Sequence, residues 1–236
     1  MNTPIKIDSK LKSRGIKFVK PVLSYDEIVS TFNTLCQTTR FVSGIVGRNI
    51  KKIEFPSISL NSNSKKIKIK PNNDIEVSYY KWENNFCKSY LFYTDNLTLL
   101  DISEQLKKCI LEVDNHLYAQ TLLQDCSFYT PQFYRFYINI KPMNGSFIIK
   151  FILMMEYIDI ENDTIEFDET NTTHLQQLKK INECLKKHSL THNDLAPRNI
   201  RIMKSTEKIL IYDWGESFIS NYGIDVLENM NRKELS

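Results

Sequence analysis

The chain has 236 residues and a formal net charge of +3, with 42% hydrophobic and 25% charged residues. This length suits one large domain or two small lobes, and the composition is typical of a globular soluble protein. A net charge this small does not by itself indicate a nucleic-acid partner, and the longest apolar run, 147–155, is too short to span a bilayer.

The cysteines and the N-terminal residues bear on the cellular compartment. The cysteines are Cys36, Cys87, Cys109, Cys126 and Cys184. Their odd number, wide spacing and lack of a C-x-x-C pair argue against both a disulfide framework and a zinc site, and favour a reducing compartment. The first residues lack the apolar core of a signal peptide. We therefore expect an intracellular protein, cytoplasmic or nuclear, without a membrane anchor.

The first elements in chain order are a basic arm and a helix. Residues 1–24 carry several lysines and are weakly patterned. Their charge is interpreted either as a solvated run or as a contact surface for an anionic partner. Residues 25–36 have a helical period, with Ile28, Phe32 and Leu35 on one face.

Strands and turns dominate the next part of the sequence, and a long helical pattern interrupts them at residues 102–123. The alternating segments predict strands at 53–55, 58–60, 67–69, 75–77, 86–93, 133–140 and 146–155. Residues 142–145, Pro-Met-Asn-Gly, predict a hairpin turn between the last two. The final part predicts a helix at 175–187 and short strands at 200–203 and 209–212. This order of elements predicts an α+β fold with a mainly antiparallel sheet.

Two segments near the end of the chain carry the chemistry. Residues 191–199 read T-H-N-D-L-A-P-R-N, and residues 212–215 read Y-D-W-G after a hydrophobic run. The patterns H-x-D-L-x-x-x-N and D-x-G resemble the catalytic loop and the metal-binding loop of the protein-kinase-like superfamily. The resemblance implies a bilobal fold, with a sheet-rich N-lobe at 25–155 and a minimal, mainly helical C-lobe at 156–236.

The resemblance also implies a role for each polar residue of these segments. Asp194 would orient the acceptor hydroxyl or accept its proton, and Asn199 and Asp213 would bind Mg²⁺ through oxygen atoms. Arg198 would reach the transferring phosphoryl group or Asp194 itself. His192 would brace the backbone of the loop.

Other residues are expected to shape the nucleotide site. Gly215 would let the chain turn sharply after Asp213. Residues 152–158 resemble the fifth strand and hinge of a kinase, which makes Met155 the gatekeeper. The backbones of Glu156 and Ile158 would then hydrogen-bond the adenine of ATP.

A kinase also needs a lysine paired with an acidic residue to hold the phosphates. Lys88 is the candidate lysine. Its partner is Glu112 by residue type or Asp114 by the E-x-x-x-Y spacing of the family, and the sequence leaves both open. The two acids are two apart and cannot share a helix face. The only G-x-x-G in the first half of the chain is 44–47, far upstream of Lys88, and is either a phosphate cover or a turn.

These features lead to three hypotheses. The first is an ATP- and Mg²⁺-dependent phosphotransferase that acts on a hydroxyl of a protein or a small molecule. The sequence after Gly215 has no room for an activation segment. In this respect the chain resembles minimal kinases of the RIO type, the KEOPS kinase, small fungal or viral kinase-like proteins and lipopolysaccharide-kinase-like domains. The second is a pseudokinase that serves as a nucleotide-binding or scaffold module. The third is an α+β interaction domain with a chance motif.

Overall fold

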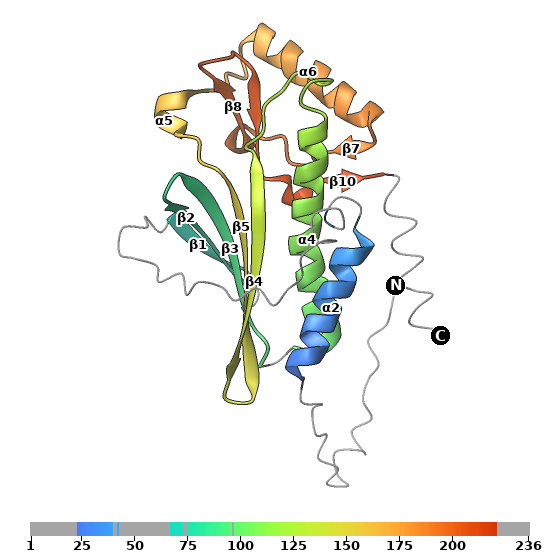
Figure 1. Cartoon of the computed structure of the whole chain (residues 1–236). Coiled ribbons are helices and arrows are strands. Elements are labelled where there is room, and N and C mark those ends of the chain that lie inside the picture. Colours follow the sequence, from blue (N-terminus) through green and yellow to red (C-terminus); the bar gives the residue numbers. More distant parts are fainter. Residues whose placement is uncertain (1–22, 40–41, 43–66, 73–74, 96, 221–236) are drawn as a thin grey trace, which may run out of the picture.

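A five-stranded antiparallel sheet forms one side of the molecule (Figure 1). The computed structural model describes residues 23–39, 42, 67–72, 75–95 and 97–220. The strands lie in the order β1-β2-β3-β5-β4, and every neighbouring pair is antiparallel. Their bounds are β1 Ile67–Asn72, β2 Ile75–Trp82, β3 Asn85–Tyr93, β4 Phe133–Met143 and β5 Ser146–Glu156. The predicted α+β fold with an antiparallel sheet is confirmed.

Several predictions from the sequence fall on residues outside the described ranges. The strands expected at 53–55 and 58–60 and the G-x-x-G at 44–47 lie outside the described residues, as does nearly all of the arm at 1–24. The remaining predicted strands of the first part coincide with β1 to β5.

The strand β5 is buried on both faces near its end, as its continuous apolar sequence requires. Phe151, Leu153 and Met155 point into the main core, which is shared with the helices. The alternate residues Ile152 and Met154 pack on the opposite face against side chains of β2 and β3. The period of two along a strand separates these sets, so the end of β5 is fixed from both sides.

Two helices cover one face of the sheet (Figure 1). They are α2 Tyr25–Thr38 and α4 Leu99–Thr121. Each begins with a capping box, formed by Ser24 with Glu27 in α2 and by Thr98 with Asp101 in α4. The Thr98 cap explains why α4 begins before the helical pattern that starts at residue 102. Within the described ranges, no helix combines the length and the apolar character needed to cross a membrane.

The helix α4 contributes to two separate hydrophobic cores. Its first part, including Leu106 and Ile110, packs with α2 and the sheet. Its end, including Ala119, packs with Phe128, a few residues after α4, and with Leu185 and other residues that follow β5 in the sequence. One rigid helix therefore connects both cores, and residues on its middle turns lie between them.

The part of the chain that the structure describes after β5 forms helices and short strands, several of which line the second core. These elements are α5 Ile160–Asp163, β6 Thr164–Glu166, α6 Thr172–Lys187, β7 Leu190–Thr191, the 3₁₀ helix η1 Pro197–Asn199, β8 Ile200–Met203, β9 Ile209–Ile211, the 3₁₀ helix η2 Trp214–Glu216 and β10 Phe218–Ile219. The strands β6, β8 and β9 form one small sheet, and β7 pairs with β10. The loop that carries Asp194 thus runs between two anchored strands, β7 and β8.

The hairpin between β4 and β5 turns over fewer residues than expected. Pro142 and Met143 still belong to β4, and the turn itself consists of Asn144 and Gly145. Both have positive φ, 42° and 87°, the conformation that a two-residue hairpin turn requires. Pro142 is tolerated within the strand because β4 is an edge strand of the sheet.

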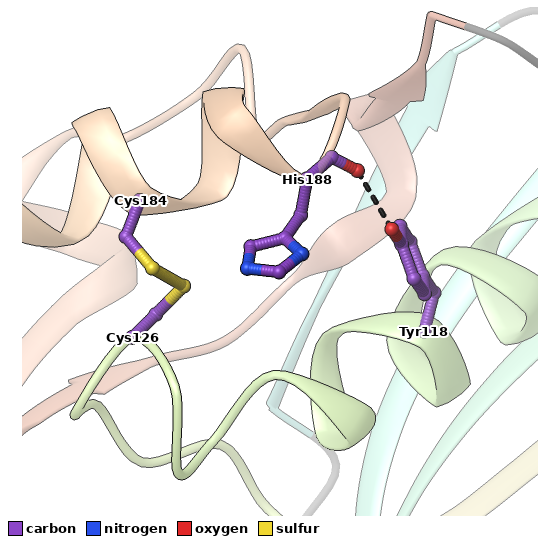
Figure 2. The surroundings of a disulfide bond; sticks show 4 residues. All are labelled: Tyr118, Cys126, Cys184 and His188. Atoms are coloured by element: carbon purple, nitrogen blue, oxygen red, sulfur yellow. Dashed lines mark hydrogen bonds between the residues drawn. A yellow bond between two sulfur atoms is a disulfide. The ribbon is translucent and has the colours of Figure 1, made fainter.

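The structure contradicts the expectation that the chain lacks a disulfide framework. Cys126 and Cys184 form a disulfide, with their Cα atoms 5.4 Å apart and a sequence separation of 58 (Figure 2). Cys126 lies in the turns after α4, and Cys184 lies in the last part of α6. Spacing along the sequence could not reveal this pair, because the packing of α6 against the end of α4 creates it. Cys36, Cys87 and Cys109 are buried and free.

Candidate active site

Lys88 is the centre of a buried ionic cluster. It lies in the middle of β3, between β2 and β5, and its side chain is only 8% exposed. Its Nζ lies 2.8 Å from Oε1 of Glu112 on α4 and 2.7 Å from Oδ1 of Asp213, which follows β9. The structure therefore brings together three residues from a strand, a helix and a loop that are far apart in sequence.

The geometry distinguishes the two acids that the sequence left open. Glu112 faces Lys88, whereas Oδ1 of Asp114 accepts a hydrogen bond of 3.0 Å from the backbone N–H of Val42. Two residues correspond to about 200° around a helix, so the two carboxylates point to opposite sides of α4. Asp114 is fully buried, and its contact with Val42 gives it a place in the packing around α2.

Tyr90 belongs to the same cluster and was not identified from the sequence. Its hydroxyl donates a hydrogen bond to Oε2 of Glu112, so both oxygens of this carboxylate are engaged. Its ring centroid lies 5.3 Å from Nζ of Lys88. Tyr90 is two residues after Lys88, and side chains two apart in a strand share a face. The period of two along β3 therefore places Tyr90 beside Lys88, although it does not show that Glu112 is the neighbour of both.

The pKa values in the cluster reflect mutual stabilisation of opposite charges. Burial alone would lower the pKa of Lys88, but the carboxylates of Glu112 and Asp213 hold it well above its ordinary value. Burial would raise the pKa of Asp213, yet the Lys88 ammonium brings it below its ordinary value. Burial and the neighbouring Glu112 carboxylate raise the pKa of Tyr90. At neutral pH the lysine is therefore charged, Asp213 is ionised, and Tyr90 keeps its proton.

The backbone after β9 differs from the expectation for Gly215. The left-handed residue is Asp213, with φ 64° and ψ 69°, and Gly215 does not have a positive φ. A Cβ atom on Gly215 would lie 3.2 Å from Oε2 of Glu112. Glycine thus avoids a tight contact with the Glu112 carboxylate, and the sharp turn is made by the aspartate.

The loop at 192–199 presents a second group of polar side chains. The Nδ2 of Asn199 donates to the backbone oxygen and to Oδ2 of Asp194, at 3.0 and 2.8 Å. The guanidinium of Arg198 forms an ion pair with Oδ1 of Asp194. Because both partners of Nδ2 are acceptors, the amide orientation of Asn199 is determined, and its Oδ1 accepts no hydrogen bond from a described residue. That oxygen is the group predicted to bind a metal ion.

His192 connects the two motif segments. It is fully buried, and its Nε2 lies 3.1 Å from the backbone oxygen of Tyr212. Its Nδ1 accepts a hydrogen bond of 3.3 Å from the backbone N–H of Asp194. These two contacts imply that Nε2 carries the proton. Burial lowers the pKa of His192, which keeps the imidazole neutral and suited to this bridge.

Further contacts, which no pattern in the sequence indicated, hold the D-x-G segment on α4. Asn115 of α4 donates from Nδ2 to the backbone oxygens of Trp214 and Ser217, at 3.3 and 2.9 Å. Trp214 is completely buried, and its indole N–H donates to Oγ1 of Thr130 at 2.9 Å. The backbone around Asp213 is therefore fixed by α4 through Asn115, three residues after Glu112 on the same helix.

The predicted adenine-binding residues lie at the end of β5. Met155 is buried and pairs with Phe86 of β3. The backbone N–H of Glu156 donates to the oxygen of Gln132 at 2.8 Å, so a contact from Glu156 to an adenine would have to come from its carbonyl oxygen. Ile158 is half-buried in the segment between β5 and α5.

Comparisons with known proteins find a structural similarity but no similarity of sequence. No family model matches the chain, and no curated protein matches its sequence. Among solved structures, the kinase PK-1 of Cydia pomonella granulovirus is similar to it, with a TM-score of 0.35 and 17% sequence identity. The similarity covers 67% of this chain and 55% of the viral kinase, so the chain spans about half the length of that protein. A similarity of this extent assigns neither an activity nor a substrate to the present chain.

Proposed function

We propose that this protein is an ATP- and Mg²⁺-dependent phosphotransferase with a hydroxyl acceptor. The observation that carries the proposal is the ion pair of Lys88 with both Glu112 and Asp213, at 2.8 and 2.7 Å. A buried lysine held between two carboxylates is expensive to desolvate, and such groups concentrate at functional sites. In phosphoryl transfer by kinases, a lysine held by an acidic residue contacts the phosphate oxygens next to the aspartate that binds Mg²⁺. Lys88, Glu112 and Asp213 have this arrangement.

Each side chain in the cluster has a defined task in this proposal. Glu112, held by Tyr90, orients the Lys88 ammonium. Lys88 has three N–H donors and adds its positive charge next to Asp213, where the nucleotide phosphates would lie. The carboxylate of Asp213 is 40% exposed although it contacts Lys88, so it remains accessible to an ion.

The residues present fit a magnesium ion that is shared with a nucleotide. Asp213 offers a carboxylate and Asn199 an amide oxygen, both hard ligands of the kind that Mg²⁺ prefers. Among the described residues, only Cys126, Cys184 and His188 place three ligand atoms of His, Cys, Asp or Glu within reach of one ion, and none of these three belongs to the proposed magnesium site. Water and phosphate oxygens would therefore complete the coordination, as is usual for Mg²⁺. When bound, the ion neutralises charge on the phosphates.

Asp194 is the residue we assign to the acceptor hydroxyl. Its carboxylate orients that hydroxyl and takes its proton as the phosphorus–oxygen bond forms. Asn199 and Arg198 hold the carboxylate at present, with Arg198 on the exposed side. Arg198 can exchange this partner for the transferring phosphoryl group, because its side chain is 68% exposed and carries several donors.

A second candidate is a nucleotide-binding module that does not transfer phosphate. One observation favours it: both oxygens of Asp194 are engaged, Oδ1 by Arg198 and Oδ2 by Asn199. If this arrangement persists with nucleotide bound, the charge of the carboxylate is shared with Arg198 and Asn199, which makes Asp194 a weaker acceptor for the proton of a hydroxyl. Binding would then be retained, while turnover would be absent.

Binding and turnover of ATP test both candidates. The wild-type protein should bind ATP in a Mg²⁺-dependent manner by isothermal titration calorimetry and should release or transfer the γ-phosphate of labelled ATP. Asp213→Ala should abolish the Mg²⁺ dependence, and Asp95→Ala, at an exposed aspartate on the turn after β3, serves as the matched control. Binding without any loss of the γ-phosphate supports the second candidate. The absence of binding in the wild type would reject both.

A further inference from the structure

A cluster of sulfur and nitrogen atoms lies at the second core and shares no residue with the ionic cluster of Lys88, Glu112 and Asp213. Cys126, Cys184 and His188 each offer one ligand atom, and these atoms all lie within 4.8 Å of one another. Cys126 comes from the turns after α4, and the other two come from the end of α6 (Figure 2). In the structure the two sulfurs are joined as a disulfide, and the imidazole lies beside them.

The residue types and their spacing are those of a soft-metal site. Cys184 and His188 are four apart at the end of a helix, so their side chains share one face. Ligand pairs with this spacing occur in zinc sites, and two thiolates with one imidazole form a known zinc ligand set that leaves a fourth position open. Cys126 supplies the third ligand from across the interface between α6 and the end of α4.

The backbone of His188 is held by the last turn of α6 and by Tyr118 of α4. Its N–H donates to the oxygens of Cys184 and Leu185, at 3.2 and 3.0 Å. Its carbonyl oxygen accepts a hydrogen bond of 2.6 Å from the hydroxyl of Tyr118 on α4 (Figure 2). No hydrogen bond joins the imidazole nitrogens of His188 to another residue in the described ranges, so the ring is available to a ligand.

We propose that Cys126, Cys184 and His188 bind a zinc ion when the disulfide is reduced. A dithiol supplies two electrons and two protons and is itself oxidised to a disulfide, while the S–S bond of the protein breaks and each sulfur takes up one proton. A phosphine with one water molecule supplies the same electrons and protons and becomes the phosphine oxide. Binding of Zn²⁺ then releases both protons and forms two Zn–S bonds and one Zn–N bond, with water in the fourth position. The two sulfurs would move to about 3.8 Å apart, the separation that Zn–S bonds of about 2.3 Å require in a tetrahedron.

Burial at this site is compatible with such an exchange. Cys126 is buried, whereas Cys184 and His188 are half-buried, so a reductant and an ion can approach from the side of α6. Cys126 follows α4 in a run of turns, which can adjust more easily than a helix. In both states the site links the end of α4 to α6, the helix that leads into β7 and the loop of Asp194. The proposal is independent of the proposed phosphotransferase activity.

Cobalt and zinc binding by the full-length protein tests the proposal. The protein is reduced with a phosphine, and the phosphine is removed under anaerobic conditions before Co²⁺ is titrated. We expect one Co²⁺ per chain, with thiolate-to-metal charge transfer from two thiolates and the visible bands of tetrahedral cobalt, and displacement by one Zn²⁺. The oxidised protein should bind neither ion at this site. A reduced, folded wild-type protein without these bands would overturn the proposal, and this result does not depend on any variant.

Variants identify the ligands. Cys126→Ser, Cys184→Ser and His188→Asn should each weaken zinc binding, measured by competition with a chromophoric chelator, by more than the roughly 10- to 100-fold loss that removal of an outer-shell partner causes. Cys36→Ala removes a free cysteine of the other core, and His174→Asn changes the histidine near the start of α6. Both controls should leave the affinity unchanged. Unaltered binding in His188→Asn, or lost binding in Cys36→Ala, would contradict the assigned ligand set.

Discussion

The ionic cluster of Lys88 and the loop of Asp194 contain similar charged groups in very different surroundings. Lys88 and Glu112 have side chains that are 8% and 5% exposed, and their pair bridges the sheet and α4. Arg198 and Asp194 are four residues apart, and their side chains are 68% and 28% exposed. The strength of a charge pair depends on the solvent around it, so these two pairs should contribute differently to the protein.

The difference in exposure predicts which pair matters for folding and which matters for turnover. Removing one partner of a buried pair leaves a charge without solvent or counter-ion, which is strongly destabilising. Water replaces the lost partner of an exposed pair, so such a pair contributes little to folding. We therefore expect substitutions in the ionic cluster to affect both folding and nucleotide binding, and substitutions in the loop to affect turnover with little effect on folding.

The largest effect is expected for Lys88→Met. The carboxylate of Glu112 would remain buried with only the Tyr90 hydroxyl, so the free energy of unfolding should fall by about 3–5 kcal/mol, and Mg²⁺-ATP binding should be lost. Urea denaturation and calorimetry measure these two quantities. Lys108→Met, at an exposed position of α4, should stay within about 0.5 kcal/mol of wild type.

A double variant sharpens this prediction. Replacing the pair with apolar residues, Lys88→Met with Glu112→Leu, removes both buried charges and should recover much of the stability that Lys88→Met loses. Nucleotide binding should not recover, because the phosphate-binding cation is still absent. A double variant that binds Mg²⁺-ATP would show that the pair serves the fold alone.

Asp194→Asn is expected to have the opposite profile. The amide keeps the shape of the side chain and an oxygen for Asn199, but it cannot accept a proton from the acceptor hydroxyl. Turnover should fall by roughly 10²- to 10⁴-fold, the usual contribution of a general base. The unfolding midpoint in urea should change little. A variant that is as active as wild type would remove Asp194 from the chemistry.

Buried histidines make the stability depend on pH. Burial lowers the pKa of His116 from 6.5 to about 4, and its Nε2 lies 2.6 Å from the backbone oxygen of Pro131. Between these pH values the unfolded chain binds more protons than the folded chain, so the free energy of unfolding falls as the pH falls from about 6.5 to about 4. The total loss from His116 should be roughly 3 kcal/mol.

Urea denaturation at pH 7 and pH 4.5 measures this dependence. His116→Gln keeps a donor for the Pro131 oxygen and should flatten it. A smaller slope should remain from His192, whose pKa burial also lowers. An unchanged slope in His116→Gln would mean that other groups dominate the titration.

The smallest effect on folding is expected for Arg198→Met. The ion pair with Asp194 is exposed, so its loss should change the free energy of unfolding by less than about 0.5 kcal/mol. A loss above about 2 kcal/mol would place this pair in the same class as Lys88 and Glu112. Turnover should still decrease, because the variant lacks the cation that we assign to the phosphoryl group.

The sequence predicted the elements better than it predicted their contacts. Periodicity located α2, α4, α6 and the described strands of the sheet, because each period is a local property of the chain. Periodicity did not reveal Tyr90 or Asn115, because their roles depend on which neighbours a particular face meets. The roles assigned to the loop residues remain predictions that the experiments above address.

Two assignments were wrong or incomplete for the same reason. The cysteine spacing argued against a disulfide, yet the packing of α6 on the end of α4 brings Cys126 and Cys184 together. Glycine in D-x-G was expected to make the turn, yet Asp213 has the left-handed conformation and Gly215 provides room for Glu112. In each case the deciding neighbour comes from a distant part of the chain.

By itself, the sequence determined the groups that lie close together along the chain. His192, Asp194 and Asn199 fall within one loop, so their types and spacing could be read directly. Only the tertiary structure decided that Lys88 pairs with Glu112 rather than with another acid, and that Asp213 joins them across 125 residues. The physical reason is that a buried ion pair is set by how the sheet, α4 and the segment after β9 pack together, and no local pattern encodes that packing.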